Sequence, residues 1–144
     1  MAEDTSIDAT WTVTFATLRI MHRSLHSSRI TSRLGLQPSH VSDRSDSELA
    51  RHVAPIPRMV WELSSEHKLH SNDLDQHLAC LVGIILPLAE QIESLRSEGA
   101  LTDVFCLWMS ERQGGPTVDW QQLRDLGALK LPLSFDVYFP DDRP

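Results

Sequence analysis

The chain has 144 residues, 41% of them hydrophobic and 23% charged, with four Trp and four Phe. This length suits one domain around a single core, and the composition argues against a chain that is disordered throughout. The formal net charge of −7 argues against general nucleic-acid binding, which depends on clustered Lys and Arg. We expect one domain over residues 1–144, with an ordered core over about 10–139, an acidic N-terminal tail and a Pro/Asp-rich C-terminal tail.

The sequence also bears on the compartment. Residues 1–8 are acidic and no basic flank precedes an apolar run there, so we expect no cleaved secretion signal and a cytoplasmic protein. The most apolar run, residues 78–89, is shorter than the roughly 20 residues of a membrane span, and we interpret it as a buried helix. Cys80 and Cys106 lie in apolar stretches, where we expect free core thiols rather than a disulfide.

The first predicted element is a strand. Residues 12–21 alternate apolar with polar side chains, the period of a half-buried strand, and a slip in the pattern at Phe15 predicts a bulge. A short helix follows, with Ser27 or Ser28 as its N-cap. Gly35 is expected to end this helix in the left-handed conformation.

The middle of the chain holds the clearest helix. A short edge strand around 40–42, a surface loop and a strand over 59–63 are predicted before it. The helix is expected to begin at the N-cap Asn72, and apolar residues recur at three- and four-residue steps from Leu74 to Leu95. Pro87 should kink it, because proline lacks an N–H and its ring disturbs the preceding turn.

The last third predicts a strand, a helix and a strand. Residues 103–110 are continuously apolar enough for a central strand, Thr117 and Gly127 bound a short helix, and residues 131–139 alternate as a final strand. Two similar strand-helix-strand pieces would thus flank the long helix. We predict an α+β fold, a ferredoxin-like two-layer sandwich: a mostly antiparallel sheet of four or five strands, two short helices and one long kinked helix.

A set of short motifs carries a family resemblance. The helix ends in Leu34, Gly35, Leu36 and Pro38, Trp61 lies in a strand, a Leu-rich helix follows, and the closing strand holds Phe135, Asp136 and Tyr138. Over roughly residues 11–139 the chain resembles the bacterial family catalogued as domain of unknown function 4279. The resemblance implies a one-domain bacterial α+β protein and assigns no activity, cofactor or catalytic residue.

One polar cluster has the residue types of a metal site: His67, His70, Asp73, Asp75 and His77. Their spacing lacks an H-x-x-x-H pair within the helix and a Cys partner, so we interpret the acids as groups that favour a helix start. We predict no metal site, no cofactor and no catalytic residue in the chain. Among the four tryptophans we expect core packing, with Trp11 the most exposed.

The basic residues are unevenly distributed along the chain. No acid lies between Asp8 and Asp43, and this segment holds a candidate basic binding patch for a phosphate-bearing or acidic partner, Arg19, Arg23, Arg29 and Arg33. The other interpretation of these arginines is charge scattered over several solvated faces.

These observations favour binding over catalysis. We expect a small accessory or partner-binding protein, such as an immunity-type protein or a complex subunit, that binds another protein through its acidic surface or a sheet edge, and no membrane or nucleic acid. The alternative is an enzyme or small-ligand binder with a site assembled from distant residues, in which groups such as Arg58, Glu62 or His77 converge in a pocket. The sequence sets no oligomeric state.

Overall fold

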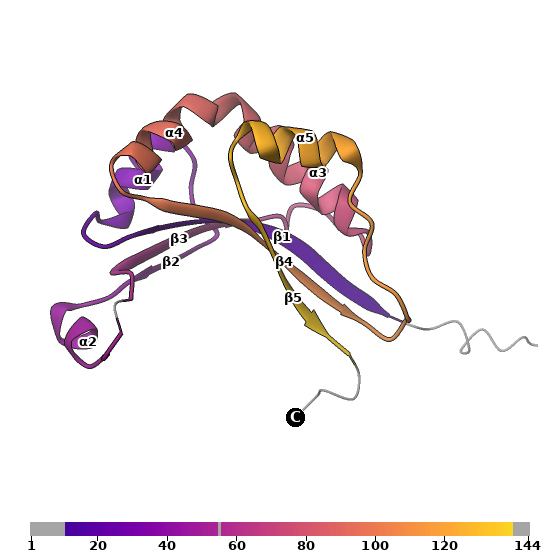
Figure 1. Ribbon diagram of the computed structural model, residues 1–144, viewed down its shortest axis with the longest axis horizontal. Coiled ribbons are helices and arrows are strands. Elements are labelled where there is room, and N and C mark those ends of the chain that lie inside the picture. Colours follow the sequence, from indigo (N-terminus) through magenta and orange to yellow (C-terminus); the bar gives the residue numbers. More distant parts are fainter. Residues whose placement is uncertain (1–10, 55, 140–144) are drawn as a thin grey trace, which may run out of the picture.

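The computed structural model describes residues 11–54 and 56–139, which build a five-stranded sheet with helices on one face (Figure 1). The strand order is β2-β3-β1-β4-β5. Three neighbouring pairs are antiparallel, and β5 runs parallel to β4, so the sheet is mixed. The strands are β1 (Thr12–His22), β2 (His40–Asp43), β3 (Met59–Ser64), β4 (Leu101–Ser110) and β5 (Leu133–Tyr138).

The helices confirm the α+β class. In Figure 1 the helices α1, α3, α4 and α5 lie above the sheet, while the short α2 lies apart, next to β2 and β3. The long predicted helix is broken into α3, a 3-10 turn and α4, with Pro87 in the turn, as its missing N–H requires. The helices are α1 (Ser27–Leu34), α2 (Asp46–Ala50), α3 (Leu74–Ile85), η2 (Leu86–Leu88), α4 (Ala89–Ser97) and α5 (Trp120–Ala128).

The core lies between the sheet and the helices. Inward-facing β1 residues Ala16, Leu18 and Ile20 are buried against the apolar stripe of α3 and α4. The expected bulge in β1 is wrong, because its pairing with β4 runs without interruption from Thr12 to Met21. The pattern slipped because Thr14, a polar residue, points inward and satisfies its hydroxyl by donating to the Leu107 carbonyl at 2.6 Å.

Three helices begin at other N-caps than those predicted. The N-cap of α1 is His26, because the Ser27 hydroxyl donates to Asp43 Oδ2 at 2.8 Å instead. Asp73, not Asn72, caps α3 by accepting from the Asp75 N–H at 2.9 Å. Asp119 similarly replaces the expected Thr117 at the start of α5.

The predicted similarity of the two ends of the chain does not extend to the sheet. The strands β4 and β5 are direct parallel neighbours, whereas β3 lies between β1 and β2. The helix α2 was also not expected. It begins where Ser45 accepts a hydrogen bond from the Glu48 N–H, with Asp46 in the first turn favouring the helix dipole.

Two further expectations concern the ends and the membrane. The proposed loose tails, residues 1–8 and 140–144, lie outside the described residues. The continuous helical segment Leu74–Ser97 has 24 residues and contains an 18-residue window with a mean hydropathy of 1.6, enough by length and composition to cross a membrane. Buried core helices pass the same test. Leu78, Ile85 and Ile92 of this segment are fully buried in the core of this domain.

Two glycines should respond oppositely to alanine. Gly35 ends α1 at φ +69° and its N–H donates to the Thr31 carbonyl at 2.8 Å, so Gly35→Ala should destabilise the fold by about 1 kcal/mol through the left-handed backbone. Gly83 lies inside α3, where a methyl group meets open space, and Gly83→Ala should stabilise by about 0.5–1 kcal/mol. Urea denaturation of both variants measures the signs, and equal signs would contradict this assignment.

Candidate binding surface

The side of the sheet opposite the helix layer is the candidate surface, which we call the helix-free face. Side chains alternate along each strand, so the residues flanking the inward-facing set point to this side. Its members come from all five strands and sit opposite one another in the registers of the sheet: Val13, Phe15, Thr17, Arg19 and Met21 of β1, Val60, Glu62 and Ser64 of β3, Leu101, Asp103, Phe105, Leu107 and Met109 of β4, His40 and Ser42 of β2, and Ser134, Asp136 and Tyr138 of β5.

A polar row crosses the middle of the helix-free face. The Arg19 guanidinium donates from Nε and from Nη2 to the two carboxylate oxygens of Asp103, at 2.8 and 2.6 Å, and lies 4.7 Å from the centre of the Phe105 ring. The hydrogen bond to Asp103, and to a lesser degree the nearby charge of Glu62, raises the pKa of Arg19. The charges of Arg19 and Asp103 cancel one another, so the Glu62 carboxylate carries the remaining charge of the row.

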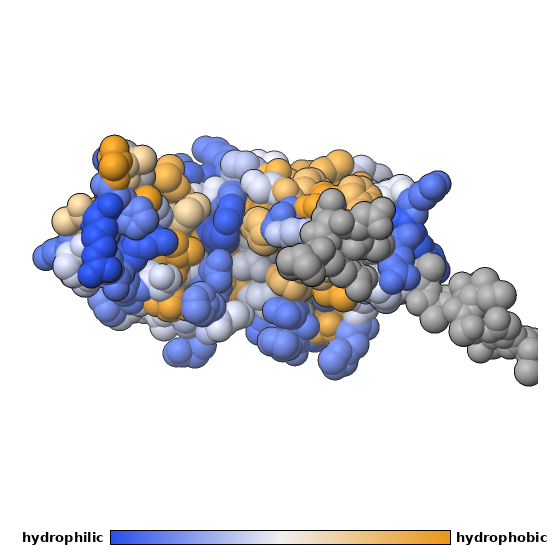
Figure 2. All heavy atoms as spheres, turned by 90° about the horizontal axis from the view of Figure 1, so that it is seen from below, coloured by the Kyte–Doolittle hydropathy of each residue, from blue (hydrophilic) through white to orange (hydrophobic). Residues whose placement is uncertain are grey.

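Apolar side chains lie on both sides of this row. Met21, Val60 and Leu101 are on one side, and Leu101 is 67% exposed. On the other side are aromatic and aliphatic residues, with the exposed Val13 and Tyr138 among them. Figure 2, seen from below, shows apolar residues (orange) exposed between polar ones (blue) on this side of the molecule. Large apolar groups exposed together on a folded protein are typical of a contact surface.

Several shallow hollows border the face, and two of them have a distinct chemistry. One, of about 320 Å³, is lined by Phe15 and Phe105 together with the acids Glu62 and Glu66 and the imidazoles of His40 and His67. Aromatic rings beside carboxylates favour a cationic group, through the electron-rich ring faces and direct charge attraction. This hollow therefore suits a Lys or Arg side chain of a partner.

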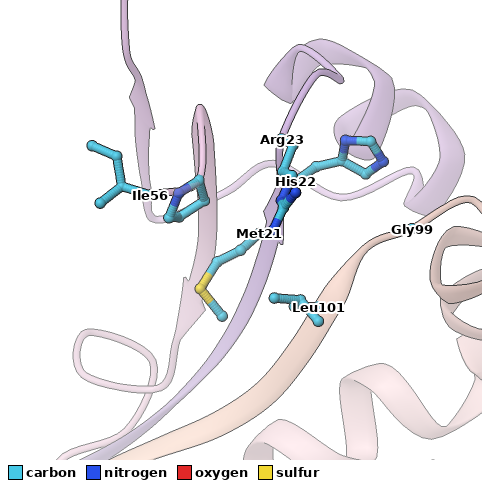
Figure 3. Close-up of a pocket in the computed structure, with 7 residues that line it drawn as sticks. Met21, His22, Arg23, Ile56, Gly99 and Leu101 are labelled. Carbon is cyan, nitrogen blue, oxygen red and sulfur yellow. The ribbon is translucent and has the colours of Figure 1, made fainter. Parts of the chain in front are cut away.

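The other hollow, of about 220 Å³, lies where β1 ends and β4 begins (Figure 3). Met21 and Leu101 point toward one another there, and Ile56 belongs to the wall. His22 is occupied in holding the turn: its Nε2 donates to the Glu98 carbonyl at 2.8 Å, and its Nδ1 accepts from the backbone N–H groups that follow. The hollow thus offers apolar surface, with the exposed Arg23 in its lining and the His22 ring held by the turn.

The structure distributes the four predicted patch arginines. Arg19 lies on the helix-free face, paired with Asp103, whereas Arg33 belongs to α1 in the helix layer. Arg33 donates to Glu98 at 2.6 Å, and this hydrogen bond lowers the pKa of Glu98. Arg23 and Arg29 are exposed. The basic patch remains a prediction, with Arg23 and Arg29 as the members that are open to solvent.

The alternative site groups do not converge. Arg58 pairs with Asp46 of α2, Glu62 lies on the helix-free face, and His77 is buried on the inward side of α3. Asp73 and Asp75 of the histidine-rich cluster serve as a helix cap and as the acceptor of hydrogen bonds from the Asp119 N–H and the Gln122 amide. Among residues 11–54 and 56–139, no group of three His, Cys, Asp or Glu side chains is placed to hold a metal ion.

His77 and Ser65 form a buried pair that resembles a catalytic dyad in its contacts. The carbonyl of Ser71 only accepts, so His77 Nε2 donates to it at 2.9 Å and Nδ1 accepts from the Ser65 hydroxyl at 2.7 Å. Ser65 Oγ also accepts from the Ala16 N–H at 3.0 Å. Because Ser65 is 0% exposed, no substrate reaches its hydroxyl, and the pair ties β1, the loop after β3 and α3 together.

The tryptophans partly depart from expectation. Trp61 is fully buried and donates from Nε1 to Thr31 Oγ1 at 3.0 Å, and Trp108 packs against the core. The exposed tryptophan is Trp120, at 62%, whereas Trp11 is half-buried. The reason is the orientation of α5, whose buried face is formed by Gln122 and Leu126.

Both thiols are free, as predicted, but they differ in burial. Burial raises the pKa of Cys106 to about 12, so at pH 8 its reactive thiolate fraction is on the order of 10⁻⁴. We expect a thiol reagent at pH 8 to label the half-buried Cys80 in the folded protein and Cys106 only after denaturation. Mass spectrometry of the labelled peptides measures this order, and rapid native labelling of Cys106 would contradict its placement.

Comparison with family models decides the affiliation. The model of the family described as Domain of unknown function (DUF4279) matches residues 11–140. The chain belongs to this family. A comparison with curated proteins and with solved structures finds no match. The matched span includes every strand and helix of the described residues. Gly35 and Trp61, which carried the resemblance, lie at a helix end and in the core.

Proposed function

We propose that this chain is a non-catalytic binding protein that takes a protein partner on its helix-free face. The observation that carries the proposal is an apolar sheet surface, with Val13, Leu101 and Tyr138 exposed, that faces away from the helix layer. Aromatic residues and methionine are enriched at protein interfaces, and this face holds Phe15, Phe105, Met21 and Met109.

The charges of the surface support a partner with a basic side chain. Arg19 and Asp103 neutralise one another, while Glu62 and Glu66 line the hollow beside Phe15. A Lys or Arg of the partner would find two carboxylates and an aromatic wall there. The chain as a whole carries a net charge of −7, which steers positively charged partners toward it.

This proposal keeps the wider role expected from the sequence. It describes an accessory protein of the cytoplasm of a bacterium, of the immunity type or a subunit of a complex. We also propose a ferredoxin-like origin for the first four strands, supported by their antiparallel order β2-β3-β1-β4 and by helices between β1 and β2 and between β3 and β4. β5 is then an addition to that unit.

Affinity purification of the tagged protein from its source organism tests the binding function. The variant Leu101→Glu places a charge on the helix-free face, and Leu86→Glu, at a residue 37% exposed in the helix layer, is the matched control. We expect a stoichiometric partner with the wild-type protein and with Leu86→Glu, and its loss with Leu101→Glu. Loss with Arg23→Glu/Arg29→Glu alone would instead place the interface on the basic segment.

A further inference from the structure

The outer edge of β5 offers backbone N–H and C=O groups to another strand. Within residues 11–54 and 56–139, β5 pairs with β4 on one side and with no strand on the other. The Pro132 carbonyl accepts a hydrogen bond from the Val104 N–H at 2.8 Å. This bond fixes which β5 residues direct their backbone groups toward β4 and which direct them away from it. Leu133, Phe135 and Val137 therefore direct their N–H and C=O groups to the free edge.

This edge lacks the devices that usually prevent pairing. The opposite edge strand, β2, is four residues long with polar His40, Ser42 and Asp43. In contrast, β5 has six residues without Lys or Pro, and Phe135 and Val137 are 45% and 44% exposed. An exposed apolar edge strand is a template for another strand.

We propose that a second copy of this chain pairs with β5, antiparallel across a two-fold axis, with Phe135 opposite Phe135. This register places Leu133 opposite Val137 on the side of the helix layer and Ser134 opposite Asp136 on the helix-free face. Apolar groups then meet apolar groups, and the Ser134 hydroxyl faces a carboxylate that can accept a hydrogen bond from it. Three directly opposed outward-facing pairs exchange about six backbone hydrogen bonds.

Other two-fold registers are less favourable. Moving the axis by one residue toward the C-terminus sets the two Asp136 carboxylates opposite one another, and like charges at directly opposed positions destabilise a strand pair. Moving it by two residues in the same direction makes Phe139, which follows the end of β5, a required partner of Phe135. The Phe135 register is the one in which the outward-directed Leu133, Phe135 and Val137 all find their partners among themselves.

The dimer would carry two copies of the proposed binding surface. Joined at β5, the two sheets form one ten-stranded sheet, and each protomer keeps its own helix-free face available for a partner. The dimer is thus independent of the proposed binding function. Because the contact is a single strand pair, we expect a dissociation constant on the order of 10–100 μM.

Cysteine cross-linking tests the register. In β4, Cys106 is the neighbour of Phe135, so the background is Cys80→Ser/Cys106→Ala, checked by circular dichroism for a retained fold. We expect Phe135→Cys to form a disulfide-linked dimer under mild oxidation at least tenfold faster than Asp136→Cys or Val137→Cys, whose Cα atoms would lie too far from their symmetry mates. Equal rates, or fastest linkage at another position, would overturn the proposal.

Sedimentation velocity tests the equilibrium. The wild-type protein should shift from monomer to dimer between about 5 μM and 500 μM. Val137→Pro removes an N–H that points away from β4, so the fold should remain while dimerisation weakens at least tenfold. A wild-type protein that stays monomeric up to 500 μM, or a folded Val137→Pro variant that dimerises as tightly as the wild type, would contradict pairing through β5.

Discussion

Replacing His77 with alanine is expected to destabilise the fold by about 3 kcal/mol. The imidazole is 2% exposed and joins the Ser65 hydroxyl to the Ser71 carbonyl. Its removal leaves a cavity between α3 and the sheet, and the buried Ser65 hydroxyl loses the acceptor of its hydrogen bond. Both effects act on the folded state and have no counterpart in the unfolded chain.

Urea denaturation followed by far-UV circular dichroism measures this loss. His67→Ala is the control, because the side chain of His67 is 89% exposed and should change the free energy of unfolding by less than about 0.5 kcal/mol. A loss below about 1 kcal/mol for His77→Ala would mean that the buried pair does not tie β1 to α3.

Replacing Trp61 with alanine should have a larger effect, about 4 kcal/mol. Trp61 is fully buried in β3 and is the largest side chain of the core. Its Nε1 donates to Thr31 of α1, so Trp61 links that helix to the sheet by a polar as well as an apolar contact. Trp61→Phe keeps most of the apolar volume and should cost about half as much.

A double-mutant cycle with Thr31→Ala isolates the hydrogen bond. In the wild-type background Thr31→Ala leaves the buried Nε1–H without its acceptor, whereas in the Trp61→Phe background no donor is stranded. We expect a coupling free energy of about 1 kcal/mol. A coupling of zero would show that the Trp61 contribution is apolar packing alone.

The parts of the fold set by local sequence could be predicted. The stripe from Leu74 to Leu95 lies on one face of α3 and α4, and Pro87 marks the break between them, because periodicity and a missing N–H act within a few residues. Gly35 has the left-handed conformation for the same reason. The predicted N-cap of α1 was wrong because a group distant in the sequence binds it: Asp43 accepts the hydrogen bond of the Ser27 hydroxyl.

The candidate surface could not be predicted, because strand order joins residues that are far apart in the chain. Arg19 and Asp103 are 84 positions apart and meet only because β1 and β4 are neighbours. A signal did exist: each is the one Lys, Arg, Asp or Glu residue of its strand. The sequence grouped Arg19 with Arg33 by proximity, whereas the alternation of β1 separates them across the sheet.

Site-specific photo-cross-linking in the source organism tests the central claim most directly, that the helix-free face binds a protein. A photoreactive phenylalanine analogue at Phe105 retains the aromatic ring of that face, and the same analogue at the exposed Glu90 of α4 reports on the helix layer. We expect one discrete cross-linked protein from position 105 and none from position 90. A cross-link at position 90 alone, or none at either position, would contradict binding through the helix-free face.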